Sequence, residues 1–346
     1  MKLIEIHDTT MRDGNHAMKH SLSARTVQLH CLMADRAGIY SVEVGHGNGL
    51  GASSYQVGFS SFNDEQIISI ARQSLKKTQL TVHVMPGFAV YEQDIKPAIS
   101  LGVDIFRVGV HCTEADLSEN FIRKITDAGK RAYGCLMMSH MATYDQLIKE
   151  AEKIYSYGAN AVCIYDSAGA YDQSRVETLI KKLKKEFGKK VGFHGHNNLG
   201  LAVANSLTAI ESGADIIDAS VCGFGAGAGN TQLEILASIL DSRNVKSPIK
   251  IPELYDLANY ASSTYAQTKP FPSTISIVSA ISGVFSGFAP HVEKAASLHG
   301  VNSFDLFRVL GQKGVVGGQE DIIYATASEM SAGINNDVDP SFKPKK

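Results

Sequence analysis

Short apolar runs rich in β-branched residues alternate with longer segments of helical periodicity from residue 3 to about residue 240. The apolar runs predict eight strands, at residues 3–6, 41–45, 80–84, 105–110, 131–137, 161–165, 190–194 and 216–220. Strands that alternate with helices are typical of parallel sheets, because each helical crossover returns the chain to the same end of the sheet.

Eight strand–helix units predict an α/β protein with a (β/α)8 TIM barrel and a C-terminal helical subdomain. An open doubly wound sheet is the alternative that shares this alternation. We expect residues 1–245 to form the catalytic barrel and residues 246–346 to form a helical extension that contacts partners. No low-complexity linker separates the two parts, so the extension is expected to pack on the barrel.

Composition excludes several classes of function. The formal charge is -2, and the one basic run, residues 181–190, is typical of the solvated end of a helix. Neither feature indicates binding to nucleic acid or to an acidic membrane. The five cysteines form no C-x-x-C pair, and no apolar run approaches the roughly 20 residues that cross a bilayer. We therefore expect a cytoplasmic protein with reduced, buried thiols.

Polar and titratable residues follow the predicted strands, where barrel enzymes carry their chemistry. These residues are Asp8, Arg12, Asp13, Glu43, His46, His83, Arg107, His111, His140, Asp166, Ser167, His194, His196 and Asp218. The sequence therefore predicts one polar rim at the carboxyl ends of the strands.

The HGHNN segment at the end of the seventh strand suggests a metal site. His194 and His196 are two positions apart, so both imidazoles project to the same side of a strand. The loop that carries Asp13 neighbours them on the rim. Two imidazoles and one carboxylate suit Mn²⁺ best, with Mg²⁺ or Co²⁺ as alternatives and Zn²⁺ less favoured. Asn230 is a candidate fourth ligand, and a pair of hydrogen-bonded core histidines is the alternative interpretation.

The glycine-rich segment GFGAGAGN, residues 223–230, follows the eighth strand. Barrels often bind phosphate at this place through exposed backbone N–H groups. The alternative is a tight turn that brings Asn230 close to the metal site.

Several motifs resemble those of the metal-dependent 4-hydroxy-2-oxovalerate aldolases, which are pyruvate-specific class II aldolases of the HMG-CoA lyase-like metallolyase superfamily. The matches are HDTTMRDGNHAMKH, VEVGHGNGLG, HCTEAD, LMMSHM, YDSAGA, GFHGHNNLGLAVANS, DASVCGFGAGAGN and VVGGQED. D-x-T-x-R-D-G and H-x-H mark only the superfamily, whereas VEVGHGNGLG, HCTEAD, LMMSHM and VVGGQED are specific. The resemblance extends from residue 7 to residue 323.

The resemblance implies a retro-aldol reaction that cleaves a 4-hydroxy-2-oxo acid reversibly to pyruvate and a short aldehyde, acetaldehyde, in aromatic hydrocarbon catabolism. It implies that the divalent metal is held by Asp13, His194 and His196. Arg12 would contact the pyruvoyl oxygens, and His16 would be the general base for the C4 hydroxyl.

Other residues receive weaker roles from the same resemblance. Ser167, in YDSAGA, would contact the carboxylate end of the substrate. Apart from the resemblance, the positions of Glu43 and His46 near the end of their strand lead us to expect that they orient ligands or contribute a further ligand. Phe285 would border the C4 end of the substrate, where the family has tyrosine. That substitution removes a hydroxyl near the aldehyde side and puts the family's chain-length and stereochemical preferences in doubt.

Three other functions remain open. One is an acyl-CoA-dependent Claisen condensing enzyme or lyase of the isopropylmalate synthase or HMG-CoA lyase type. Against it, this chain has Ala226 and Gly227 in place of the synthase motif and lacks the Cys-Pro loop of the lyases. A Schiff-base aldolase would need a lysine at the barrel mouth, for which Lys19 is the candidate. The third is a barrel without catalytic activity that serves as a binding partner.

The resemblance also implies a partner, an acylating aldehyde dehydrogenase that receives the aldehyde. A homo-oligomer is a further possibility that the sequence does not decide. Of the remaining histidines, His30, His291 and His299 are expected in helical or surface contexts without a role in the site.

Overall fold

The computed structural model describes residues 3–265 and 269–333. Eight parallel strands form a closed barrel in chain order, and β1 pairs with β8. The strands are β1 (Glu5–Asp8), β2 (Ser41–Glu43), β3 (Gln79–Val84), β4 (Ile105–His111), β5 (Arg131–Met137), β6 (Ala161–Asp166), β7 (Lys190–Gly195) and β8 (Ile216–Ala219). The closure confirms the predicted TIM barrel and excludes the open sheet. Each strand overlaps its predicted run, although β1 begins at Glu5 rather than at Leu3.

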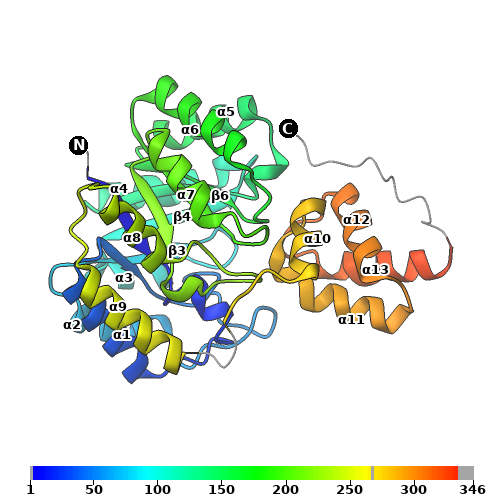
Figure 1. Cartoon of the computed structure of the whole chain (residues 1–346), viewed down its shortest axis with the longest axis horizontal. Coiled ribbons are helices and arrows are strands. Elements are labelled where there is room, and N and C mark those ends of the chain that lie inside the picture. Colours follow the sequence, from blue (N-terminus) through cyan, green and yellow to red (C-terminus); the bar gives the residue numbers. More distant parts are fainter. Residues whose placement is uncertain (1–2, 266–268, 334–346) are drawn as a thin grey trace.

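Helices surround the barrel (Figure 1). They are α1 (Ala24–Ala37), α2 (Asp64–Ser74), α3 (Lys96–Ser100), α4 (Glu119–Asp127), α5 (Tyr144–Ser156), α6 (Gln173–Phe187), α7 (Ala202–Glu211) and α8 (Leu233–Ser242). Several begin at a residue whose side chain accepts a hydrogen bond from a first-turn N–H, as Ser23, Asn63, Thr143 and Asp172 do. Local capping therefore defines where these helices begin.

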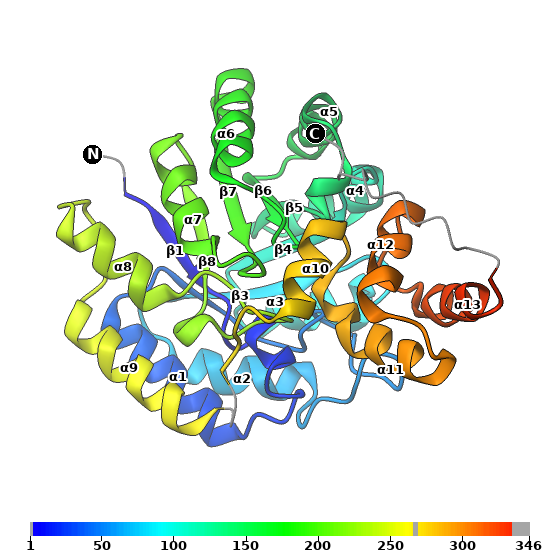
Figure 2. The same ribbon diagram turned by 45° about the vertical axis from the view of Figure 1, so that its right-hand side comes forward.

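The helices beyond residue 250 divide between two hydrophobic cores. Helix α9 (Ile251–Thr264) lies beside α1 (Figure 2), and its buried Leu254 and Leu257 belong to the core of the barrel. A separate core joins α10 (Thr274–Ser282), α11 (Ala289–His299), α12 (Ser303–Lys313) and α13 (Glu320–Ser331), which we call the helical subdomain. The chain passes from the first core to the second after α9. The sequence had predicted a domain boundary after residue 245.

The helical subdomain contacts the carboxyl-terminal rim of the barrel through three loops. His140, after β5, lies with Nε2 at 2.8 Å from the carbonyl oxygen of Gly283. Asn198, after β7, donates to the carbonyl oxygen of Ser276 at 3.1 Å. Ser286 donates to the carbonyl oxygen of Ser167, after β6, at 3.4 Å. The subdomain is therefore anchored at the end of the barrel where the chemistry of barrel enzymes is found.

Within the described part of the chain, no helix is both long and apolar enough to cross a membrane. All five cysteines are buried and free of disulfide bonds, as the sequence predicted.

Candidate metal and substrate site

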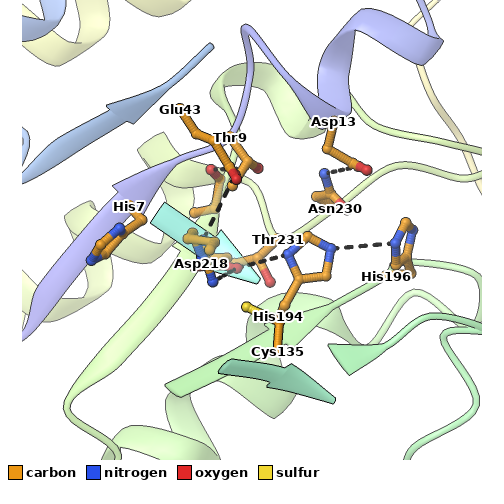
Figure 3. Close-up of polar contacts among 12 residues, drawn as sticks. His7, Thr9, Asp13, Glu43, Cys135, His194, His196, Asp218, Asn230 and Thr231 are labelled. Atoms are coloured by element: carbon orange, nitrogen blue, oxygen red, sulfur yellow. Dashed lines mark hydrogen bonds and ion pairs between the residues drawn. The ribbon is translucent and has the colours of Figure 1, made fainter. Parts of the chain in front are cut away.

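Asp13, His194 and His196 converge at the mouth of the barrel (Figure 3). Asp13 begins the short 3-10 turn η1 (Asp13–His16) after β1, and the two histidines lie at the end of β7. One candidate ligand atom from each residue lies within 4.8 Å of the others, and the Nε2 atoms of the histidines are 3.3 Å apart. The three side chains are buried, so these donors are shielded from water.

Asp13 is held ionised by its neighbours. Its Oδ1 accepts from Arg12 at 2.8 Å, and its Oδ2 accepts from the side-chain amide of Asn230 at 2.6 Å. Burial alone would raise the pKa of Asp13, but the charge of Arg12 and the nearby imidazoles hold that pKa well below its usual range. The carboxylate is therefore an anionic ligand at neutral pH.

The orientation of His194 is fixed from inside the barrel. Its Nδ1 lies 3.0 Å from Oδ2 of Asp218, and the same oxygen accepts from the guanidinium of Arg107 at 2.5 Å. Burial opposes the charge of Asp218, yet Arg107 and His194 lower its pKa. An ionised Asp218 accepts the Nδ1 proton of His194 and leaves the Nε2 lone pair facing His196.

The donor set fits a divalent cation. Burial, aided by His194 and opposed by Asp13, lowers the pKa of His196 to about 4, so its imidazole is neutral and can act as a ligand. One carboxylate oxygen and two imidazole nitrogens then face a common point. Such a set leaves about half of an octahedral shell open for an oxygen-rich ligand.

Arg12 lies between the metal cluster and β2. It donates to Asp13, to the carbonyl oxygen of Gly47 at 3.2 Å and to Glu43 at 3.3 Å. Its Nε is buried and has no hydrogen-bond partner among the described residues. Burial disfavours the charge of Arg12, but Glu43 and Asp13 raise its pKa. The site therefore contains a permanent cation with a spare donor.

His16, at the end of η1, packs directly against Gly47. A Cβ atom on Gly47 would lie only 2.4 Å from Nε2 of His16, so the ring occupies space that only glycine leaves free. Burial lowers the pKa of His16, Arg12 lowers it further, and Asp13 opposes the change. His16 is consequently a neutral imidazole in the loop that also carries Asp13.

The residues expected to assist the metal differ in their contacts. Asn230 is hydrogen-bonded to Asp13, and its own Oδ1 is buried without a partner among the described residues. Glu43 contacts Arg12, and Arg107 is near it at 3.7 Å, so it orients cations. His46 has both nitrogens engaged, with the carbonyl of Gly58 at 3.2 Å and the N–H of Asn48 at 3.0 Å. His46 therefore has no nitrogen left to bind a metal.

The contacts that the structure gives for Ser167 and Phe285 are with residues other than Asp13, His194 and His196. The hydroxyl of Ser167 accepts from the backbone N–H of Met138 at 3.0 Å. The Phe285 ring packs edge-on against Phe288, with centroids 5.7 Å apart, at the edge of the subdomain core. The neighbouring Ser286 connects the segment that carries Phe285 to Ser167.

The glycine-rich loop after β8 turns back on itself. The N–H of Gly229 donates to the carbonyl of Ala226 at 3.0 Å, that of Asn230 to Gly223 at 2.9 Å, and that of Ala226 to Asp13 at 3.4 Å. A Cβ on Gly225 would lie 2.5 Å from the side chain of Asn230. This is the tight-turn alternative, in which the loop brings Asn230 to Asp13.

The sequence predicted Arg107 and Asp218 on the polar rim but did not predict a role for either residue in the metal site. Arg107 is completely buried, and its guanidinium lies over the ring of Tyr165 at 5.4 Å. The His194 ring stacks on the same Tyr165 ring at a centroid distance of 4.5 Å. A charged residue at an inward position of the apolar run IFRVGV is the signal that could have identified Arg107.

His30 lies on α1, which agrees with the helical context predicted for it. His30 is completely buried on the side of α1 that faces the barrel, together with Val27, Cys31 and Ala34. Its position three residues after Val27 and four before Ala34 placed it on the apolar stripe of the helix. The candidate Schiff-base lysine, Lys19, is exposed.

Comparison with known proteins identifies the family. Residues 3–261 match the HMGL-like family, and residues 270–332 match the DmpG-like communication domain. The chain is 47% identical to a 4-hydroxy-2-oxovalerate aldolase of Spirochaeta aurantia, over 95% of this chain and 96% of that protein. It is 45% identical to a protein of the same name from Pectobacterium atrosepticum, over 98% of each chain.

Solved structures share the fold at lower identity. The N-terminal domain of a putative aldolase from Bacteroides vulgatus gives a TM-score of 0.73 at 23% identity, over 83% of this chain and 95% of that one. The carboxyl transferase domain of Rhizobium etli pyruvate carboxylase gives 0.80 at 15% identity, over 96% and 61%. The HMGL-like match and the Asp13 cluster together support a divalent metal. The chain belongs to the 4-hydroxy-2-oxovalerate aldolase family of carbon–carbon lyases.

Proposed function

We propose that the chain cleaves 4-hydroxy-2-oxovalerate and similar 4-hydroxy-2-oxo acids reversibly to pyruvate and a short aldehyde, acetaldehyde for the five-carbon acid. The observation that carries the proposal is the convergence of Asp13, His194 and His196 beside a buried arginine and a neutral histidine. The name shared by the relatives supports the same reaction and does not favour the acyl-CoA-dependent alternative.

Asp13, His194 and His196 would hold the metal, for which Mn²⁺ is the proposed ion because the donors are mixed nitrogen and oxygen with an open half-shell. A divalent ion bound there supplies a Lewis acid that polarises the 2-oxo group and stabilises negative charge on its oxygen.

Arg12 and His16 supply the remaining chemistry in this proposal. His16 accepts the proton of the C4 hydroxyl, the C3–C4 bond breaks, and its electron pair remains with the three-carbon fragment as the enolate of pyruvate. The Arg12 guanidinium stabilises the negative charge on the enolate oxygen, and Glu43 and Gly47 hold that guanidinium in place. C4 leaves as the aldehyde carbonyl when the C3–C4 bond breaks. The proton that His16 took from the hydroxyl is then passed on to C3, which gives pyruvate and returns His16 to its neutral form.

Ser167 and Phe285 would border the two ends of the substrate. Ser286 connects their segments, so a shift of one is transmitted to the other. Phenylalanine offers no hydroxyl at the aldehyde end, and the proposal therefore assigns aldehyde selectivity to shape at this position.

The reaction is tested with metal-depleted protein and 4-hydroxy-2-oxovalerate, without coenzyme A, by measuring pyruvate release. Mn²⁺ is expected to restore turnover, and His16→Ala should lower kcat by about 10²- to 10⁴-fold, the usual contribution of a general base. Lys19→Ala is the matched control in the same loop and should retain full activity. Turnover that survives both chelation and Asp13→Asn, or that requires an acyl-CoA, would refute the proposal. A protein that neither binds Mn²⁺ nor turns over would favour the non-catalytic barrel.

We also propose that the helical subdomain binds an acylating aldehyde dehydrogenase, because residues 270–332 match a communication domain. Phe271, Ile281 and Leu298 are exposed apolar side chains of this region. Sizing of a mixture with the candidate dehydrogenase at micromolar concentration should give one complex, and Ile281→Lys should weaken it. Separate elution of the two proteins would contradict this assignment. The chain alone in the same experiment reports whether it forms a homo-oligomer.

A further inference from the structure

Three side chains from distant parts of the sequence form a buried hydrogen-bonded chain behind the metal site. The hydroxyl of Tyr265, directly after α9, lies 2.7 Å from Nδ1 of His30 on α1. Nε2 of His30 lies 2.7 Å from Oδ2 of Asp8, the last residue of β1. His30 and Asp8 are completely buried, so no water competes for these bonds.

The chain continues into both loops that form the metal site. Oδ1 of Asp8 accepts from the N–H of Thr10 at 2.9 Å and from the Thr10 hydroxyl. The same hydroxyl oxygen accepts from the N–H of Val221 at 2.8 Å. Thr10 lies in the loop that continues to Asp13, and Val221 begins the turn that continues to Asn230. The Asp8 carboxylate therefore joins the starts of two loops whose ends, Asp13 and Asn230, are bonded to each other.

The hydrogen bonds have one consistent direction. Asp8 accepts from Thr10, so the natural partner on its other oxygen is the N–H at Nε2 of His30. In the tautomer with its proton on Nε2, His30 offers a lone pair at Nδ1, and the hydroxyl of Tyr265 is the donor to it. Burial, and then the proximity of Asp8, raise the pKa of Tyr265, so its hydroxyl keeps the proton that this bond needs.

Tyr265 also contacts the Asn230 loop directly. Its ring lies 5.9 Å from the ring of Phe224, and the carbonyl oxygen of Phe224 accepts from the side chain of Asn230 at 3.1 Å. Tyr265 is thus connected to the same loop by an apolar contact and by the hydrogen-bonded chain. It also immediately precedes the segment that leads to the helical subdomain.

We propose that Tyr265 and His30 are positioning residues of the metal site, which set the spacing between the Asp13 and Asn230 loops through Asp8 and Thr10. This inference rests on the metal site in the proposed function and deepens it. Two apolar side chains in place of His30 and Asp8 would fill the same space between α1 and β1. They would avoid the free-energy cost of removing a histidine and a carboxylate from water. Directional bonds fix the geometry of the loop more narrowly than apolar packing does.

The test measures Mn²⁺ binding by substrate-free protein, using the EPR signal of free Mn²⁺, so that turnover is not the readout. Tyr265→Phe removes the hydroxyl and keeps the ring against Phe224. It should weaken Mn²⁺ binding about three- to tenfold. Loss of a residue that orients a metal ligand directly usually weakens binding about tenfold or more, and Tyr265 acts only through other residues. Tyr260→Phe is the matched control, because Tyr260 lies on α9 outside the chain of bonds and phenylalanine keeps the ring that packs on Tyr265 at 5.6 Å. This variant should bind Mn²⁺ as the wild type does.

Two His30 variants distinguish positioning from general stability. His30→Gln retains an amide N–H that can reach Asp8 and should bind Mn²⁺ more tightly than His30→Ala. If Tyr265 acts through His30, adding Tyr265→Phe to His30→Ala should produce no further loss. Melting temperatures of the metal-free variants are recorded in parallel, and Tyr265→Phe with His30→Gln carries the test if His30→Ala does not fold.

The same titrations test the positioning role and the metal assignment separately. Tyr265→Phe and His30→Gln that bind Mn²⁺ like the wild type, while Asp13→Asn has lost binding, would overturn the positioning role and leave the metal site intact. Wild-type affinity in Asp13→Asn would refute the metal assignment itself, and the positioning role with it.

Discussion

The interior of the barrel and the core of the helical subdomain differ in the charged side chains that they bury. The upper interior of the barrel holds the charged Glu43, Arg107 and Asp218 at almost no exposure, whereas the subdomain core is built from residues such as Leu306, Phe307 and Leu310. Buried ion pairs contribute little net stability compared with apolar packing. The difference therefore indicates that the barrel interior is organised to orient the site, and that the subdomain core is organised to hold four helices together.

The largest expected effect comes from breaking the charged interior. Arg107→Met should lower the free energy of unfolding by about 4 kcal/mol, because it leaves two buried carboxylates without their shared cation. Mn²⁺ affinity should fall in the same variant, because Arg107 no longer fixes the Asp218 oxygen that contacts Nδ1 of His194. Chemical denaturation and metal titration check the two effects, and a stable variant with full affinity would show that the barrel interior is not organised around the site.

Leu310→Ala makes the matching change in the subdomain. Loss of a completely buried leucine should cost about 3 kcal/mol through lost burial and the cavity that remains. Mn²⁺ affinity should stay unchanged, because the three residues that would hold the ion, Asp13, His194 and His196, all belong to the barrel. Reduced affinity in this variant, measured by the same titration, would contradict the separation of roles.

Asp218→Asn sharpens the comparison within the barrel. The substitution keeps the shape of the side chain and removes the charge that fixes Nδ1 of His194. Mn²⁺ should bind about tenfold or more weakly, as is usual when an outer partner of a ligating histidine is lost. Asp215→Asn is the control, because Asp215 lies directly before β8 and accepts from Lys184 rather than contacting His194. Its Mn²⁺ affinity should be unchanged.

The smallest effect is expected where the two regions meet. His140→Ala removes one hydrogen bond to the carbonyl of Gly283 and should cost about 1 kcal/mol. This loss of stability should appear as faster amide hydrogen exchange from Gly283 to Phe285, with little change in the barrel strands. Equal increases throughout the barrel would show that the two cores do not unfold separately.

Particular residues show how far the sequence predicts this molecule. The barrel followed from periodicity, because every strand has a helix-period segment after it and strands of this kind close in only a few ways. Asp13, His194 and His196 could be brought together because only β8 separates β1 from β7 in a closed barrel, so the loops that follow these two strands lie close on the rim. The division after α9 could not be predicted, because α9 carries the same apolar periodicity as the subdomain helices and only its packing on α1 assigns it to the barrel.

Other contacts depended on three-dimensional proximity. The apolar stripe of α1 marks His30 as buried, but nothing in the local sequence shows that its partners are Asp8 and Tyr265. Phe285 lies at the edge of the subdomain core, and nothing in the nearby sequence tells whether the Phe285 ring faces the substrate or packs against Phe288. Periodicity predicts which face is buried, whereas pairing between buried polar groups is decided by the fold.

The most direct test of the account is a crystal of the protein with Mn²⁺ and oxalate, which mimics the pyruvate enolate, measured at the manganese absorption edge. The account predicts one strong anomalous peak bonded to Asp13, His194 and His196, with oxalate in the open half of the coordination shell and Arg12 against its oxygens. A peak elsewhere, or a refined structure in which Asp13 is turned away from the two histidines, would contradict it.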